Sequence, residues 1–151
     1  MFNLSKRSRF GLYVMVELAR TPDKQRSTDD LAEVLGVSAN HLAKVLQTLG
    51  RVNWVSGTRG PTGGYQLTTD PKRIAMSDVI ELFEGTQDFS RCSFLEEEDC
   101  QMQAACEIKH VVGEIEEQAY YTLKSVTIHM LAEPSRKRHS ALVTIGGRNG
   151  A

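Results

Sequence analysis

Two short helices joined by a glycine turn are encoded near the N-terminus, and this pattern constrains the fold more than any other feature of the chain. A helix is predicted over residues 29–35, and Gly36 suits the left-handed backbone position that follows a helix end. Ser38 can cap a second helix over residues 39–49, which Gly50 is expected to end. Apolar residues recur along that second helix at helical spacing, namely Leu42, Val45, Leu46 and Leu49. The pattern predicts a helix-turn-helix unit, whose second helix reads DNA in proteins of this type.

A glycine-rich hairpin is predicted directly after these helices. Residues 52–56 are rich in strand formers, and residues 65–68 alternate like a returning strand. The tight loop between them, residues 57–64, ends in Gly63 and Gly64, which permit the positive φ angles of a sharp turn. A hairpin that follows a recognition helix is the wing of a winged helix-turn-helix domain. The predicted fold class is therefore mostly α with a small β-hairpin.

Three further helices are predicted around this unit. The first covers residues 6–20 behind a Ser5 cap, and another covers residues 78–84 behind a Ser77 cap. A long helix then runs from about residue 106 to residue 126. The apolar stripe of the first helix is expected to include Phe10, Tyr13, Val14 and Leu18. The stripe of the long helix is expected to consist of Val112, Ile115, Ala119, Leu123 and Val126.

Candidate DNA contacts lie on the second helix and on the hairpin. The N-terminal end of a recognition helix enters the major groove, and its residues here are Ser38, Asn40, His41, Lys44 and Gln47. Asn and Gln can pair with adenine, and Lys reaches guanine or a phosphate. Arg59 and Gly60 lie at the hairpin tip, from which an Arg can enter a narrow minor groove. The alternative is an ordinary solvated helix face and an ordinary hairpin with an exposed Arg.

The charge distribution supports a polyanionic partner. Residues 1–73 contain 11 Lys and Arg against 6 Asp and Glu, whereas residues 74–133 contain 3 against 13. No apolar run approaches the roughly 20 residues that a membrane span needs. The N-terminus lacks the features of a secretory signal, so a cytoplasmic protein is expected. No catalytic motif is found, and an enzyme is not expected.

The cysteines form a single cluster. Cys92, Cys100 and Cys106 fall within fifteen residues, and the chain has no others. In a reducing cytoplasm, clustered cysteines act as metal ligands or redox groups more often than as disulfides. Their spacing lacks the paired Cys-x2-Cys of most small zinc sites, whereas iron–sulfur clusters are held mainly by thiolates, with His in some centres. Two alternatives remain, a cluster-free thiol redox switch and a zinc site completed by His110.

The segment at residues 59–67 closely resembles the wing signature of a family of bacterial transcription regulators, the one that includes IscR and NsrR. Its sequence is Arg-Gly-Pro-Thr-Gly-Gly-Tyr-Gln-Leu. The resemblance covers residues 2–133. The matching features, in chain order, are Leu4-Ser5-Lys6, Leu31-Ala32 through Val37-Ser38, Val79-Ile80 before Glu84-Gly85, and the three cysteines. It implies a homodimeric winged-helix repressor or activator that binds DNA, with a long C-terminal dimerisation helix and an iron–sulfur cluster beside it.

The cysteine segment departs from the family pattern in two ways. Seven residues separate the first two cysteines instead of about five, and the extra length adds the acids of residues 96–99. His110 lies four positions after Cys106, not three as in the IscR type, but residues at i and i+4 share a helix face. The NsrR type takes a carboxylate from the partner's first helix, and residues 8–10 contain none. A His fourth ligand favours a 2Fe–2S cluster, whereas three cysteines with an open site suit 4Fe–4S.

The expected organisation has four parts. Residues 1–85 form the winged helix-turn-helix domain, and residues 86–110 form the cysteine-rich cluster-binding loop. Residues 111–133 form the dimerisation helix, and residues 134–151 form a flexible basic tail. The predicted protein is a homodimer that binds a palindromic double-stranded operator, acts as a repressor, and senses redox state, nitric oxide or iron–sulfur status.

Overall fold

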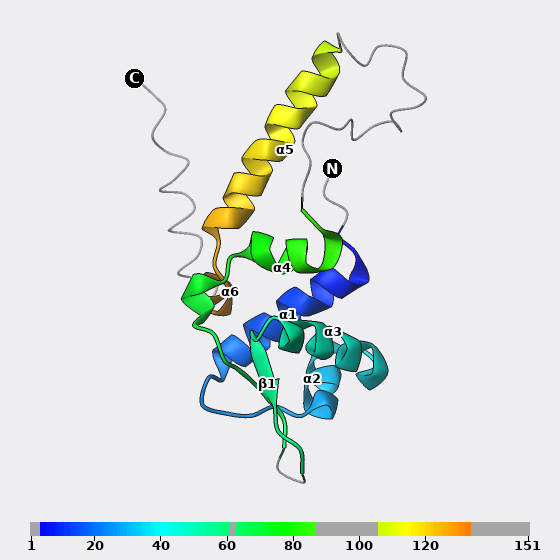
Figure 1. Cartoon of the computed structure of the whole chain (residues 1–151), viewed down its shortest axis with the longest axis vertical. Coiled ribbons are helices and arrows are strands. Elements are labelled where there is room, and N and C mark those ends of the chain that lie inside the picture. The colour runs from blue at the N-terminus through cyan, green and yellow to red at the C-terminus, as the bar shows by residue number, and fades with distance from the viewer. Residues whose placement is uncertain (1–3, 61–62, 87–105, 134–151) are drawn as a thin grey trace.

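The computed structural model describes residues 4–60, 63–86 and 106–133. Its elements, in chain order, are α1 (Lys6–Arg20), α2 (Thr28–Leu35), α3 (Ala39–Arg51), β1 (Val55–Gly57), β2 (Tyr65–Leu67), the 3-10 helix η1 (Pro71–Arg73), α4 (Met76–Glu84), α5 (Glu107–Ser125) and α6 (Ile128–Ala132). Figure 1 shows α1 within a body of helices, with the β-hairpin projecting from one end and α5 rising from the other. The predicted fold class, mostly helical with a small hairpin wing, is confirmed.

The predicted end of α2 and the predicted start of α3 are confirmed, and α2 begins one residue earlier than predicted. The Ser27 side chain accepts a hydrogen bond from the Asp30 backbone N–H at 3.1 Å, and Gly36 ends α2 with φ 66°. Ser38 caps α3 in the same way. The prediction for the end of α3 is wrong, because the helix continues through Gly50 to Arg51. The chain then turns at Asn53, which has a φ of 56° and belongs to a residue type that tolerates the left-handed region.

The core lies where α1 meets α3, α4 and α6. The predicted stripe of α3 is fully buried, and its members pack in one cluster with Met15, Leu31 and Ile128. The stripe predicted for α1 is wrong at Tyr13, which is 51% exposed. Because α1 is covered by neighbours on several sides, its buried face is wider than one stripe and includes Ser8, Gly11, Leu12, Val14, Met15 and Leu18.

The wing contains a third extended segment that was not predicted from the sequence. β1 and β2 pair antiparallel, with Val55 opposite Leu67. Arg26 then exchanges two backbone hydrogen bonds with Tyr65, at 2.9 and 2.8 Å. A Cβ atom on Gly64 would lie 2.8 Å from the Arg26 carbonyl group. Gly64 is therefore required by this close approach. The positive φ of the hairpin lies at Gly60 (124°), and the structure shows none at Gly63 or Gly64, which corrects the prediction for those two positions.

The strand before the wing tip is also shorter than predicted. The prediction placed it over residues 52–56, but β1 begins at Val55. Residues 52–54 form the turn that leaves α3, and the Trp54 N–H bonds back to the Leu49 carbonyl at 3.2 Å. The backbone of Asn53 is held by Thr68, whose hydroxyl donates to the Asn53 carbonyl oxygen. These contacts join the wing to the end of α3.

The start of α4 differs from the prediction. The helix begins at Met76, and the Asp78 carboxylate accepts from the Ala75 N–H at 2.8 Å. Ser77 is therefore not a cap. It lies inside the helix, it is 1% exposed, and its hydroxyl has no hydrogen-bond partner among the described residues. The predicted end is confirmed, because Gly85 caps α4 with φ 88°.

α5 is attached to the body mainly through its C-terminal half. The Tyr120 hydroxyl donates to the Glu81 carboxylate of α4 at 2.7 Å, and this neighbouring carboxylate raises the pKa of Tyr120. Beyond the helix, the Met76 N–H bonds to the Val126 carbonyl at 2.7 Å. The N-terminal half of α5 extends away from these contacts (Figure 1). Within the described residues, no helix has the length and apolar character needed to cross a membrane.

Candidate functional site

The polar face of α3 is directed to solvent. Ser38, Asn40, His41, Lys44 and Gln47 are all exposed, whereas the opposite face of the helix is buried in the core. The Ser38 hydroxyl lies 2.7 Å from Nδ1 of His41 and also caps the helix, so these two side chains hold each other at the N-terminal end. The arrangement presents hydrogen-bonding groups on the side of α3 that a recognition helix turns toward base edges.

The wing tip presents Arg59 and Gly60 to solvent. Below the tip, the Thr58 hydroxyl donates to the Gln25 side-chain carbonyl at 2.8 Å, and the Thr58 N–H bonds to the Gly64 carbonyl at 3.0 Å. Among the described residues, no carboxylate forms an ion pair with Arg59. The tip therefore offers an uncompensated guanidinium on a narrow, anchored hairpin.

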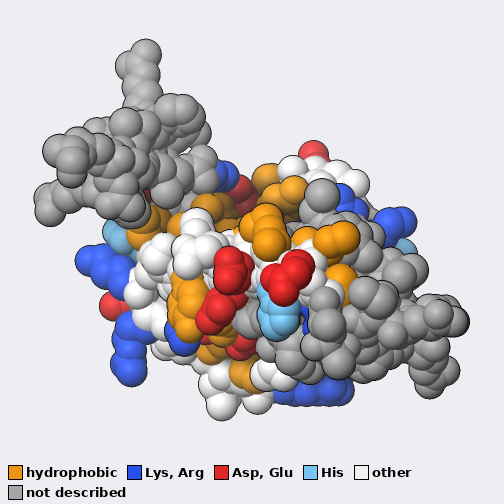
Figure 2. Space-filling view, turned by 90° about the horizontal axis from the view of Figure 1, so that it is seen from above, with side chains coloured by type: hydrophobic (Ala, Val, Ile, Leu, Met, Phe, Trp, Pro, Cys, Tyr) orange, Lys and Arg blue, Asp and Glu red, His pale blue; other side chains and the backbone are white. Residues whose placement is uncertain are grey.

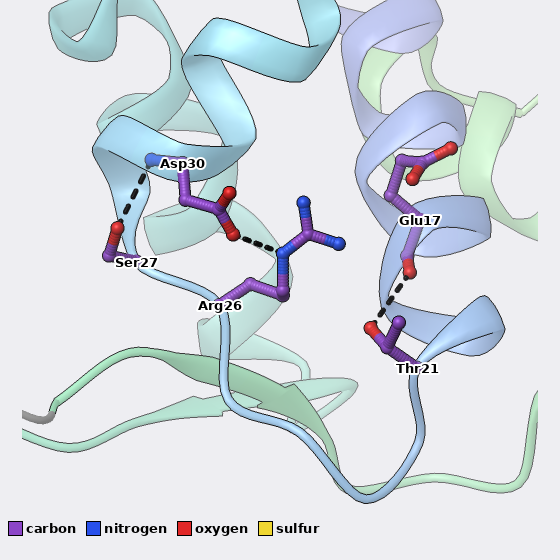
Figure 3. A network of polar contacts seen from close by, with 5 residues as sticks. All are labelled: Glu17, Thr21, Arg26, Ser27 and Asp30. Carbon is purple, nitrogen blue, oxygen red and sulfur yellow. Dashed lines mark hydrogen bonds and ion pairs between the residues drawn. The ribbon is translucent and has the colours of Figure 1, made fainter.

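A polar network fixes the segment between α1 and α2 (Figure 3). The Thr21 hydroxyl donates to the Glu17 carbonyl at 3.3 Å, and the Arg26 Nε donates to the Asp30 carboxylate. This second hydrogen bond lowers the pKa of Asp30. The Arg26 side chain is only 10% exposed, and the same residue pairs through its backbone with β2. Arg26 thus joins the start of the helix-turn-helix to the wing.

A second network joins the start of α1 to the end of α4. The Ser5 N–H donates to the Glu84 carboxylate at 2.8 Å, and the fully buried Ser8 hydroxyl donates to the same oxygen. The Ser8 hydrogen bond is the main reason that the pKa of Glu84 is lowered. Glu84 directly precedes Gly85, from which the chain leaves toward the cysteines. No local pattern in the sequence signals this contact, because its partners are 76 and 79 residues apart.

The cysteine site is described only at its C-terminal end. Cys106 is the N-cap residue of α5 and is half-buried, and its side chain makes no capping hydrogen bond. His110 is exposed one turn further on, and its N–H bonds to the Cys106 carbonyl at 3.3 Å. Cys92 and Cys100 lie outside the described residues. Within those residues, no three His, Cys, Asp or Glu side chains gather as a metal site.

Cys106 and His110 have side chains of the types that bind iron–sulfur clusters. The Cys106 sulfur lies at the N-cap of α5 and makes no capping bond, so it is available as a ligand. The imidazole of His110, one turn further along α5, is a second donor of the kind found in some iron–sulfur centres. The two other residues expected to hold a cluster, Cys92 and Cys100, lie outside the described residues.

The N-terminal half of α5 carries an exposed apolar face. Ile108, Val111 and Ile115 are 67%, 55% and 63% exposed, and they follow one another at helical spacing. Figure 2 shows hydrophobic side chains exposed among acidic ones at this end of the molecule. Of the predicted stripe, Leu123 packs against the core, whereas Ile115 contacts solvent. Ile108 and Val111 were absent from the predicted stripe, although their spacing of three was a usable signal.

Known proteins match most of the chain. The sequence model of the Rrf2 family, described as an iron-dependent transcriptional regulator, matches residues 4–134. BadM of Rhodopseudomonas palustris, an HTH-type transcriptional regulator by name, is 40% identical over 129 residues, which cover 85% of this chain and 80% of BadM. The structure of CymR, described as the global cysteine regulator of B. subtilis, has a TM-score of 0.72 and 28% identity, over 87% of this chain and 97% of CymR. IscR of T. potens shares the fold, with a TM-score of 0.67 and 20% identity, over 99% of this chain and 94% of IscR.

Proposed function

Because this chain belongs to the Rrf2 family of transcriptional regulators, we propose that it controls transcription through an iron–sulfur cluster whose state alters DNA binding. The relatives are transcriptional regulators, so the protein is a regulator and not an enzyme. As a DNA-binding regulator, it acts in the cytoplasm. The proposal has three parts, which rest on different residues. They are the DNA contacts, the cluster and the coupling between the two.

The DNA-binding part rests on one observation, the exposed polar face of α3 beside an anchored wing. In the proposed complex, Ser38, Asn40, His41, Lys44 and Gln47 enter the major groove. Arg59 and Gly60 approach the minor groove, whose negative potential attracts an Arg on a thin loop. The operator is a palindromic duplex, because two copies of the reading face related by a dimer axis require two matching half-sites.

The cluster part rests on Cys106 at the start of α5, on the two other cysteines and on the description of the family as iron-dependent. Cys92, Cys100 and Cys106 hold the cluster, and His110 supplies the fourth ligand of a 2Fe–2S centre. When bound, the cluster supplies redox chemistry and sensitivity to oxidants or nitric oxide. The acidic character of residues 74–133 disfavours further negative charge beside it.

The coupling part rests on the Glu84 network. Residues 86–110 form the cluster-binding segment, and this segment starts next to the carboxylate that fixes the first turn of α1. A rearrangement of the segment therefore acts on residues 1–85, the DNA-binding domain. Residues 111–133 form the dimerisation region, in which the exposed apolar face of α5 meets a second copy. A change at Glu84 shifts the two α3 helices away from the spacing that both half-sites require.

The proposal is tested by anaerobic purification with iron and sulfide quantitation. Wild type, Cys106→Ala and His110→Ala are compared, with His129→Ala on α6 as a matched control for removal of an imidazole. Cys106→Ala is expected to lose the cluster, and His110→Ala is expected to change its spectrum. DNA affinity is then measured for loaded and cluster-free wild type. Equal affinities would contradict the sensing function, and an unchanged spectrum in His110→Ala would remove that residue as a ligand.

A cluster-free thiol switch is the second candidate. It is favoured by the likeness to CymR of Staphylococcus aureus, whose structure is described in an oxidized form, and by the Cys106 sulfur, which makes no capping bond. In this alternative the three cysteines respond to oxidants by forming sulfenic acid or disulfides. The visible spectrum of the anaerobically purified protein separates the two, since only a cluster absorbs near or above roughly 400 nm. Elemental analysis separates both from a zinc site.

A further inference from the structure

An open basic hollow lies between the first turn of α1, the exposed face of α3 and the end of α4. Its volume is about 990 Å³, and none of the residues that line it is acidic. Lys6, Arg7 and Arg9 of α1 line one side, and Lys44 of α3 lines the other. The hollow therefore adjoins the proposed reading face but includes three cations from a different helix.

The three α1 cations occupy positions that helix stability does not favour. They lie in the first four residues of α1, where the positive end of the helix dipole disfavours Lys and Arg, and the first turn contains no acid. All three are exposed, and among the described residues none forms an ion pair. Neither helix formation nor internal pairing explains them, whereas an anionic ligand does.

The backbone that carries these cations is held in place. Ser5 caps α1, and Glu84 accepts hydrogen bonds from Ser5 and from the buried Ser8, so the first turn is anchored at two points. Figure 1 shows the N-terminal end of α1 on one side of α3 and the wing extending on the other. The hollow lies beside α3, because Lys44 and Gln47 line it together with the α1 cations, and a helix in a major groove about 12 Å wide has a phosphate strand on each side.

The geometry points to a phosphate-binding site: the hollow receives one sugar–phosphate strand at the edge of the major groove that α3 enters, and Lys6, Arg7 and Arg9 contact its phosphates. This inference rests on the proposed DNA-binding function and adds contacts outside the helix-turn-helix and the wing. Lys44 faces the same strand from α3, so it is assigned to phosphate rather than to a base. These contacts fix the position of the protein on DNA and carry little sequence information.

The test measures how DNA affinity depends on salt. The full-length protein enriches a duplex from a random-sequence library, and a scrambled duplex of the same composition serves for comparison. Dissociation constants are measured over a salt series for wild type, Arg7→Ala and the triple variant Lys6→Ala/Arg7→Ala/Arg9→Ala. The slope of log affinity against log salt is expected to become shallower by about 0.9 for each phosphate that a variant leaves unneutralised. The preference for the enriched over the scrambled duplex is expected to stay the same.

Lys72→Ala on η1 is the matched control, because it removes one exposed cation that does not line the hollow. Thermal melting verifies that each variant is folded. An unchanged slope in the triple variant overturns the inference but leaves the proposed function standing. This result is expected if the hollow binds an acidic segment of a second copy, or a small anion, in place of DNA. A weaker sequence preference with an unchanged slope also overturns it. If wild type enriches no duplex, both the inference and the DNA-binding function fail.

Discussion

Two glycines, Gly64 and Gly50, lie in surroundings that differ in how much space they leave for a side chain. At Gly64 an added Cβ would lie 2.8 Å from the Arg26 backbone, which is too close for any side chain. At Gly50, inside α3, the nearest heavy atom to an added Cβ is the Val55 carbonyl oxygen at 3.8 Å, an ordinary contact. The first glycine permits the third segment of the wing to pair with β2, whereas the second only weakens a helix by its backbone freedom.

We therefore expect the two Gly→Ala variants to shift stability in opposite directions. Gly64→Ala should lower the free energy of unfolding by about 1–3 kcal/mol, the usual cost of overpacking. Gly50→Ala should raise it by up to about 1 kcal/mol, the difference in helix propensity. Urea unfolding measures both changes, and each variant serves as the control for the other. Stabilisation by Gly64→Ala would show that the close approach of Arg26 does not exist.

The Glu84 carboxylate should make stability depend on pH. Its hydrogen bonds from Ser8 and Ser5 lower the pKa in the folded state, so its stabilising contribution is fully present above the ordinary pKa of 4.5. The contribution disappears as the pH falls through the folded-state pKa. Glu84→Gln should therefore destabilise the protein at neutral pH more than under strongly acidic conditions. The measurement is the free energy of unfolding against pH, with Glu33→Gln on α2 as the control; an equal destabilisation at both extremes would contradict the assignment.

At the scale of elements, local signals predicted where most helices begin and end. Ser38 and Gly36 act through neighbours in the chain, so their effects were predictable from spacing alone. The prediction of Ser77 as a cap is wrong because its burial depends on distant elements that pack over α4. The role of Gly64 was missed for the same reason, since the Arg26 backbone that approaches it is far away in sequence. The exposed state of α5 was also unpredictable, because an apolar stripe does not reveal whether its partner is the same chain or a second copy.

The exposed face of α5 gives a prediction about assembly. Ile115→Glu should weaken the proposed homodimer at least about tenfold, because a charge would replace an apolar contact on this face. Glu117→Gln changes an exposed residue on another side of α5 and should leave the dimer intact. Sedimentation equilibrium measures the dissociation constant, and thermal melting at low concentration verifies the protomer. A dimer that survives Ile115→Glu unchanged would place the interface elsewhere.

At the scale of the whole molecule, a continuous series of contacts connects the start of the cysteine segment, at Gly85, to the proposed DNA-facing surface. The segment that contains Cys92 and Cys100 leaves from Gly85, and the adjacent Glu84 holds the first turn of α1. That turn carries the cations of the basic hollow, and α3 lines the other side of the same hollow. In the proposed function, a change at Gly85 therefore reaches both the α1 cations and α3 without passing through the wing.

This arrangement predicts that Ser8→Ala uncouples sensing from DNA binding. The variant removes the buried hydroxyl that donates to Glu84, but it leaves the cysteines and the α3 face unaltered. The cluster spectrum should be unchanged, whereas the ratio of DNA affinities between loaded and cluster-free protein should fall toward one. Ser27→Ala is the control, because it removes the cap of α2 and costs about 1 kcal/mol without touching the Glu84 network. A ratio that stays at the wild-type value in Ser8→Ala, while Ser27→Ala behaves as expected, would mean that the signal reaches α3 by another route, such as movement of the two protomers along α5.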